Sequence, residues 1–243
     1  MKDNEPGRLS PLILALDTTD LARGMETAVE VKEYVDIVKV GLQLFSAVGP
    51  EAVRRLREEG FEVFLDLKLN DTPNTVTSAC LALCELEPLM LTVHAMGGRE
   101  MMESARREVG ERCKAEGFRR PLLIGVTVLT SLDFHSLESI GVSGPVDEEV
   151  LRLALLIRES GLDGLVSSPL ETQSVRRAVG EEMVLITPGV RPAGVGRDDQ
   201  KRVATPGEAM RAGADFLVVG RPVYEAQEPR KAAAEIFKDA GRR

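Results

Sequence analysis

Eight short aliphatic segments recur along the chain, and each is followed by a segment with the spacing of an amphipathic helix. Near-continuous apolar runs of this kind are typical of parallel strands that are covered on both faces. Eight strand–helix units in 243 residues predict an α/β protein, a single-domain (β/α)8 TIM barrel, with a doubly wound open sheet as the alternative. We expect strands at 12–17, 37–40, 62–69, 89–95, 122–129, 164–168, 183–187 and 216–220.

The segments between these strands are expected to be helical, apart from a short irregular or helical insertion at 131–140. No composition break indicates a second domain, so the barrel is expected to span 11–243 after an N-terminal extension of residues 1–10. The expected helices are 21–35, 50–59, 74–86, 98–116, 146–160, 171–179, 206–211 and 229–240.

The third expected strand carries an unusual group of charges, in the segment 61–75 with the sequence FEVFLDLKLNDTPNT. Successive residues of a strand face opposite sides, so Asp66 and Lys68 share one face with Phe64 while the other face is aliphatic. Asp71 follows in an Asn-Asp-Thr-Pro turn. A strand covered on both faces cannot hold unpaired charges, so we expect Asp66, Lys68 and Asp71 to form the reaction centre rather than a solvated face.

Polar side chains also follow most of the other expected strands, at the end where TIM barrels carry their chemistry. One such residue alone could form a rim salt bridge, but a ring of converging charges is difficult to explain by packing. The sequence therefore predicts one site at this end of the barrel. Its members outside the central strand are Asp17, Lys39, His94, Thr130, Ser131, Arg191 and Arg221.

Two glycine- and arginine-containing loops indicate where an anion binds. Residues 188–192 read Pro-Gly-Val-Arg-Pro after the seventh strand, and residues 220–222 read Gly-Arg-Pro after the eighth. The loops after these two strands commonly bind phosphate in TIM barrels. Glycine lets backbone N–H groups approach an anion, and arginine adds a charge-assisted hydrogen-bonding fork.

Composition excludes several other functions. A net charge of −8 disfavours nucleic acid or an anionic membrane as the partner. No apolar run reaches about 18 residues, and residues 1–10 lack the apolar core of a secretion signal, so a cytoplasmic protein is expected. Three cysteines argue against a disulfide framework, and neither they nor the two histidines have metal-site spacing, so we expect buried inert thiols and no metal.

Several of these segments together resemble the orotidine 5′-phosphate decarboxylase family. The resemblance follows the family's order over nearly the whole chain, and the Asp-x-Lys-x-x-Asp-x-Pro-Asn-Thr signature is its most specific part. It implies decarboxylation of orotidine 5′-monophosphate (OMP) to UMP and CO2, the last step of de novo UMP biosynthesis, by a homodimer with shared active sites and without metal or organic cofactor. The segments are LALD (14–17), VKVGLQLF (38–45), DLKLNDTPNTV (66–76), VTVLTS (126–131), ITPGVRP (186–192), DDQKRVATP (198–206) and ADFLVVGRPV (214–223).

The resemblance also implies roles for individual residues. Lys68 is the implied proton donor, in an alternating charge network with Lys39, Asp66 and Asp71 of the partner subunit. Asp17 and Lys39 are implied to contact the ribose. The remaining substrate-binding residues that it implies are Thr130 and Ser131 at the base, Gln200, Gly220 and Arg221 at the phosphate, Arg191 and Pro188 nearby, and Thr72 and Thr75.

Two residues depart from the common family pattern: Asn70 stands where many members have His, and Thr72 where many have Ile. The first is not expected to affect the chemistry, whereas the second would weaken an apolar contact across the dimer.

Two alternative functions use the same residues. A Mg2+-dependent ketose-phosphate decarboxylase or aldolase on the same barrel would share the Asp-x-Lys-x-x-Asp core, but residues 73–75 and 198–200 favour the first interpretation. A non-catalytic nucleotide sensor would not need the complete set of lysines and aspartates.

Overall fold

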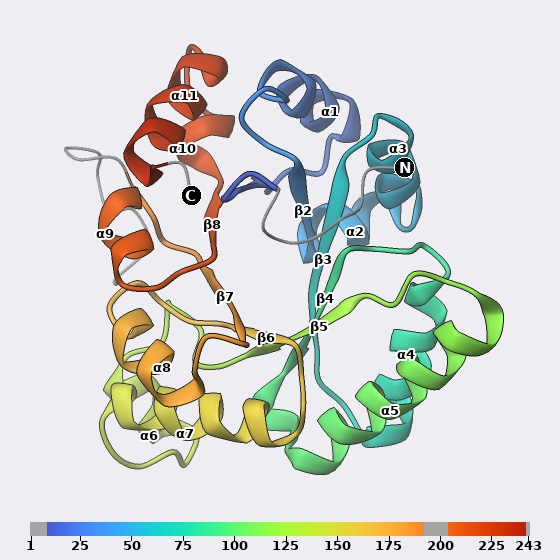
Figure 1. Cartoon of the computed structure of the whole chain (residues 1–243), viewed down its shortest axis with the longest axis vertical. Helices are drawn as coiled ribbons and strands as arrows, with labels where there is room; N and C mark the ends of the chain where they lie inside the picture. The colour runs from blue at the N-terminus through green and yellow to red at the C-terminus, as the bar shows by residue number, and fades with distance from the viewer. Residues whose placement is uncertain (1–8, 192–203, 242–243) are drawn as a thin grey trace.

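The computed structural model describes residues 9–191 and 204–241, and its eight strands are all parallel and close into a barrel in sequence order (Figure 1). Helices surround the barrel on the outside (Figure 1). The TIM-barrel prediction is thus confirmed. The strands are β1 (Leu12–Leu16), β2 (Ile37–Gly41), β3 (Glu62–Leu69), β4 (Met90–His94), β5 (Leu122–Val126), β6 (Gly164–Val166), β7 (Val184–Thr187) and β8 (Phe216–Val219).

The helices follow the predicted order, with differences at their ends. α1 ends at Glu30 rather than at residue 35, because hydrogen-bonded turns occupy the residues from Val31 to Tyr34. α2 was not expected; it begins directly after β2 and ends at Val48, and the next residue is Gly49, whose φ of 64° suits a residue without a side chain. The helices are α1 (Leu21–Glu30), α2 (Leu42–Val48), α3 (Glu51–Glu58), α4 (Pro73–Cys84), η2 (Ala95–Gly97), α5 (Arg99–Glu116), α6 (Phe134–Ser139), α7 (Val146–Glu159), α8 (Thr172–Val179), α9 (Pro206–Arg211), α10 (Arg221–Tyr224) and α11 (Pro229–Ala240).

None of the helices within the described ranges combines the length and the hydropathy that are needed to cross a membrane. The three cysteines are free and buried, Cys80 and Cys84 on α4 and Cys113 on α5. Burial raises the pKa of the Cys80 thiol to about 12, which keeps it protonated and unreactive at neutral pH. The prediction that the three thiols are buried is confirmed.

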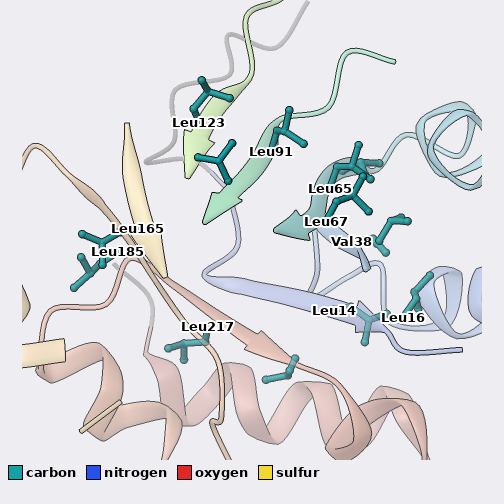
Figure 2. Close-up of a cluster of buried hydrophobic side chains, with 14 of the residues drawn as sticks. Leu14, Leu16, Val38, Leu65, Leu67, Leu91, Leu123, Leu165, Leu185 and Leu217 are labelled. Atoms are coloured by element: carbon teal, nitrogen blue, oxygen red, sulfur yellow. The ribbon is translucent and has the colours of Figure 1, made fainter. Parts of the chain in front are cut away.

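Two apolar clusters hold the barrel together. The larger one lies between the strands and the surrounding helices, and Figure 2 shows strand residues that belong to it, among them Leu91, Leu123 and Leu217. The smaller one fills the inside of the barrel with one large side chain from every strand except β6, which has Gly164 there. Its members are Ile13, Ile37, Phe64, Met90, Ile124, Ile186 and Phe216.

The twofold alternation of the strands places polar side chains directly above this inner layer. Two residues beyond Ile37 comes Lys39, two beyond Phe64 comes Asp66, and two beyond Met90 comes Thr92. Lys39, Asp66 and Thr92 are each less than a tenth exposed. The apolar layer therefore forms the floor on which the polar site is built.

Carboxylates secure the opposite end of the barrel. Asp163, just before β6, accepts hydrogen bonds from the Leu123 N–H at 2.8 Å and from both terminal nitrogens of Arg120. Asp215, just before β8, similarly accepts from the Leu185 N–H at 2.8 Å and from Arg176. These hydrogen bonds stabilise the fold rather than the site, because they lie at the opposite end of the barrel from the polar residues.

Candidate active site

A cavity of about 210 Å3 lies where the strands end at their C-terminal side. Most of the strands and the loops that follow them contribute to its wall. The lining includes apolar side chains of β5 and β6, such as Val126 and Val166, and charged side chains of β2 and β3, together with Asp17, which follows β1. The lining residues are Ala15, Asp17, Lys39, Phe64, Asp66, Lys68, Val126, Val128, Leu129, Thr130, Val166, Ser167, Ser168, Pro188, Gly189, Arg191, Val218, Gly220 and Arg221.

Four charged side chains form a chain of alternating sign along this wall. The Lys39 Nζ lies 3.2 Å from Asp17 Oδ1 and 3.5 Å from Asp66 Oδ2. The same Asp66 oxygen accepts a hydrogen bond from Lys68 Nζ at 2.8 Å. The side chains of Lys39 and Asp66 are only 11% and 10% exposed, whereas that of Lys68 is 31% exposed. Lys68 is thus the ammonium with the freest access to the cavity.

The pKa values of the two buried members follow from this pairing. Burial alone would lower the pKa of Lys39, but the negative charges of Asp66 and Asp17 outweigh it and raise the pKa above its ordinary value. Burial alone would raise the pKa of Asp66, but the charges of Lys39 and Lys68 outweigh it and hold the pKa below its usual range. Both residues are therefore fully charged at neutral pH.

The backbone of Lys68 departs from the strand geometry that its sequence predicts. Its φ is +52°, in the left-handed region that residues other than glycine seldom adopt. The Lys68 N–H donates to Thr92 Oγ1 at 2.8 Å, and the Thr92 hydroxyl donates to Asp66 Oδ1 at 3.2 Å. Backbone strain of this kind is found at functional sites, where the surroundings hold it in place.

The loops after β7 and β8 bring two arginines to the other side of the cavity. Arg191 is only 7% exposed, and its backbone N–H donates to the Ala204 carbonyl at 3.0 Å. Arg221 begins α10, directly after Gly220. A Cβ on Gly220 would lie 3.3 Å from Asp17 Oδ2, so glycine keeps this part of the wall open.

The charges of the lining residues favour an anionic ligand. Lys39, Lys68, Arg191 and Arg221 give four positive charges, and Asp17 and Asp66 give two negative ones. The described lining therefore has a net charge of +2 in a chain whose overall net charge is −8. A local potential opposite to that of the whole chain attracts and orients anions.

The chain matches the family model described as "Orotidine 5′-phosphate decarboxylase / HUMPS family" over residues 10–236. It belongs to this family. It is 50% identical over 226 residues to a protein of Moorella thermoacetica named orotidine 5′-phosphate decarboxylase, with 93% of this chain and 90% of the relative covered. A Halorhodospira halophila protein of the same name is 49% identical, with 93% of each chain covered. The crystal structure of orotidine 5′-phosphate decarboxylase from Lactobacillus acidophilus matches with a TM-score of 0.82 and 35% identity, covering 96% of this chain and 99% of that one.

The structure brings most of the predicted site residues of this family member together at one cavity. Asp17, Lys39, Asp66, Lys68, Thr130, Pro188, Arg191, Gly220 and Arg221 all line it. Asp71, Thr72 and Thr75 follow β3 on the exposed surface and do not line it, and neither does the exposed Ser131. Gln200 lies outside the described residues. His94 is half-buried at the end of β4, and burial together with the charge of Lys68 lowers its pKa.

Sequence reasoning did not single out Thr92, Gly41 or the serines at the end of β6. Ser167 and Ser168 line the cavity, and the Ser168 hydroxyl donates to the buried carboxylate of Glu171. A Cβ on Gly41 would lie 3.0 Å from Lys39 Nζ, so this glycine leaves room for the ammonium. Counting two residues beyond each inner apolar residue would have found Thr92, which lies two residues beyond Met90.

Proposed function

We propose that this protein catalyses the decarboxylation of orotidine 5′-monophosphate to UMP and CO2, the final step of de novo UMP synthesis. The observation that carries the proposal is the buried Lys39–Asp66–Lys68 array, whose most exposed ammonium borders the cavity. The relatives named orotidine 5′-phosphate decarboxylase, at up to 50% identity over nearly the whole chain, support the same substrate.

The proposed chemistry takes place at C6 of the pyrimidine. When CO2 leaves, the electron pair of the broken C–C bond stays on C6 as a carbanion with little delocalisation. The ammonium of Lys68 stabilises this charge and then donates a proton to C6, which gives UMP; solvent returns the proton to Lys68. An ammonium suits both roles because it carries three donors and no acceptor.

The stabilisation of the carbanion by the Lys68 charge can be estimated. Opposite charges 4 Å apart attract each other by roughly 4 kcal/mol at an effective dielectric constant near 20. That is about a thousandfold in rate, because each 1.36 kcal/mol corresponds to a factor of ten. The rest of the acceleration comes from the fixed arrangement of the whole array, which needs no reorganisation when the charge develops.

The other lining residues would hold the remainder of the nucleotide. In this proposal Asp17 and Lys39, which line the cavity, bind the ribose hydroxyls, and Thr130 contacts the base. Arg191, Arg221 and the Gly220 backbone bind the 5′-phosphate in the same proposal, with Gln200 as a further ligand. Binding energy from the phosphate, which does not react, would thereby serve to hold C6 against Lys68.

We further propose a homodimer in which Asp71 enters the active site of the other subunit. Asp71 follows β3 and is exposed, and its Oδ1 accepts a hydrogen bond from the Thr72 N–H at 2.6 Å. The strands next to β3 in the barrel are β2 and β4. Leu42, which follows β2, is 57% exposed, and Met96, which follows β4, is 42% exposed. Large apolar side chains exposed after the strands next to β3 support a protein–protein interface at this end of the barrel. The cytoplasmic location stays a prediction.

A spectrophotometric assay of OMP loss tests the reaction. Turnover is expected with OMP and is expected to survive EDTA, because the proposed chemistry uses no metal ion. Activity on a ketose phosphate that EDTA abolishes, without activity on OMP, would instead establish the Mg2+-dependent alternative.

Hybrid dimers test the shared site. Lys68→Ala and Asp71→Ala subunits are each expected to be inactive, and mixing them is expected to restore activity in those hybrid sites that combine intact Lys68 with intact Asp71. Absence of recovery in a mixture that forms hybrids would contradict the role of Asp71 across the interface.

A further inference from the structure

We propose that Thr92 is a positioning residue, whose hydroxyl locks the backbone of Lys68 and the carboxylate of Asp66 in the arrangement that decarboxylation requires. The inference rests on the proposed function and deepens it. Thr92 is fully buried and is not among the residues that line the cavity. It therefore acts on the substrate only through the two residues to which it is bonded.

The pairing between β3 and β4 breaks at this point. Leu65 pairs with Leu91, and the next pair is Leu69 with Val93, so β3 advances four residues while β4 advances two. Regular pairing would have continued from Leu65 by one residue on each strand. The two additional residues of β3 form a bulge, and Lys68, with φ at +52°, lies within it.

The Thr92 hydroxyl takes the place of the ladder hydrogen bond that the bulge removes. A hydroxyl has one donor and two acceptor lone pairs, and both kinds are used. A lone pair accepts the Lys68 N–H at 2.8 Å, and the proton is donated to Asp66 Oδ1 at 3.2 Å. No valine or isoleucine could make these two bonds in the same volume.

These hydrogen bonds connect Lys68, Thr92 and Asp66 in a closed cycle. Asp66 Oδ1 is held by Thr92, and Asp66 Oδ2 accepts from Lys68 Nζ at 2.8 Å. The backbone and the side chain of Lys68 are thereby both tied to Asp66, one of them through Thr92. Loss of the hydroxyl would leave the Lys68 N–H without a partner in a partly buried setting and would release the left-handed conformation.

The Thr92→Val and Thr92→Ser variants separate this role from simple packing. Thr92→Val keeps the volume and removes the hydroxyl; its kcat for OMP is expected to fall about tenfold or more, while KM and the affinity for UMP stay within about threefold. Thr92→Ser keeps the hydroxyl and is expected to retain kcat within about threefold. Thr27→Val removes another buried threonine hydroxyl, on α1, and is the matched control with unchanged kcat.

Amide hydrogen exchange gives a second measurement that does not depend on activity. The Lys68 N–H is expected to exchange at least tenfold faster in Thr92→Val than in the wild type and in Thr92→Ser, with the melting temperature of each variant measured in parallel. If Thr92→Val does not fold, Thr92→Ala, which also lacks the hydroxyl, carries the same expectation.

Three results would overturn the inference: wild-type kcat in Thr92→Val, equal losses in Thr92→Val and Thr92→Ser, or a rise in KM with kcat unchanged. If the wild-type protein does not decarboxylate OMP, the proposed function fails. The exchange of the Lys68 N–H then still decides whether Thr92 holds the bulge.

Discussion

The variant Asp66→Asn tests whether the charged array is held in a low-dielectric setting. It keeps the shape of the side chain but leaves the ammonium of the buried Lys39 with Asp17, 3.2 Å away and about half exposed, as its remaining anionic partner. Removing one partner of a buried ion pair typically costs 3–5 kcal/mol, because the other charge stays buried and uncompensated. We therefore expect the free energy of unfolding at pH 7 to fall by about 3–5 kcal/mol.

The pH dependence gives this prediction a sign. In the wild type, folding raises the pKa of Lys39. The stabilisation of the folded state by the charged Lys39 is therefore complete below the unfolded pKa, and it is lost only as the pH rises through the folded pKa. In Asp66→Asn, burial dominates and the folded pKa of Lys39 falls below the unfolded value of about 10.4. The unfolded state then binds more protons, so the stability of the variant rises with pH and the difference from the wild type narrows toward pH 9.5.

Urea denaturation of both proteins at pH 7 and pH 9.5 measures these differences. Glu33→Gln is the control, since its pair with Arg230 is exposed on both sides and its loss should change stability far less. A loss below about 1 kcal/mol in Asp66→Asn at pH 7 would refute the reasoning, and so would a difference that does not change with pH. The wild type should itself lose stability as the pH falls below about 4, because folding lowers the pKa of Asp66 and the carboxylate of the unfolded chain then binds a proton before that of the folded chain does.

Three further predictions concern other parts of the molecule. Gly41→Ala should lower kcat by about tenfold, because its Cβ would lie 3.0 Å from Lys39 Nζ; Gly110→Ala, with open space around its Cβ, should leave kcat unchanged, and equal kcat values would contradict the prediction. Arg221→Ala should raise KM for OMP by tenfold or more and should affect a substrate lacking the phosphate much less; equal effects on both would exclude a phosphate role. Asp163→Ala should lower the free energy of unfolding by about 1–3 kcal/mol with kcat unchanged, because it leaves the Leu123 N–H unsatisfied at the opposite end of the barrel; a kcat change without a stability change would show that this end affects the site.

The fold and most of the site could be predicted because both depend on local periodicity. Aliphatic runs recur eight times, and the twofold alternation of each strand fixes which residues face the inside of the barrel. Lys39 and Asp66 lie where that alternation places them, two residues above the large inner side chains.

The bulge in β3 could not be predicted in this way. The alternation of the segment around Lys68 continues without a break in the sequence, yet the pairing with β4 shifts and the backbone of Lys68 turns left-handed. At this point the Lys68 N–H donates to the hydroxyl of Thr92, 24 residues further along the chain, a contact that no local propensity indicates. Asp71 poses a similar problem, since the proposed contact of its carboxylate depends on a second chain.

The account depends most on Lys68 as the ammonium that stabilises and protonates the carbanion. Steady-state turnover of OMP by Lys68→Ala, measured beside the affinity of the same variant for UMP, tests that role most directly. We predict that kcat falls about a thousandfold or more while UMP still binds within about tenfold of the wild-type affinity. Turnover within tenfold of the wild type by a variant that binds UMP normally would contradict it.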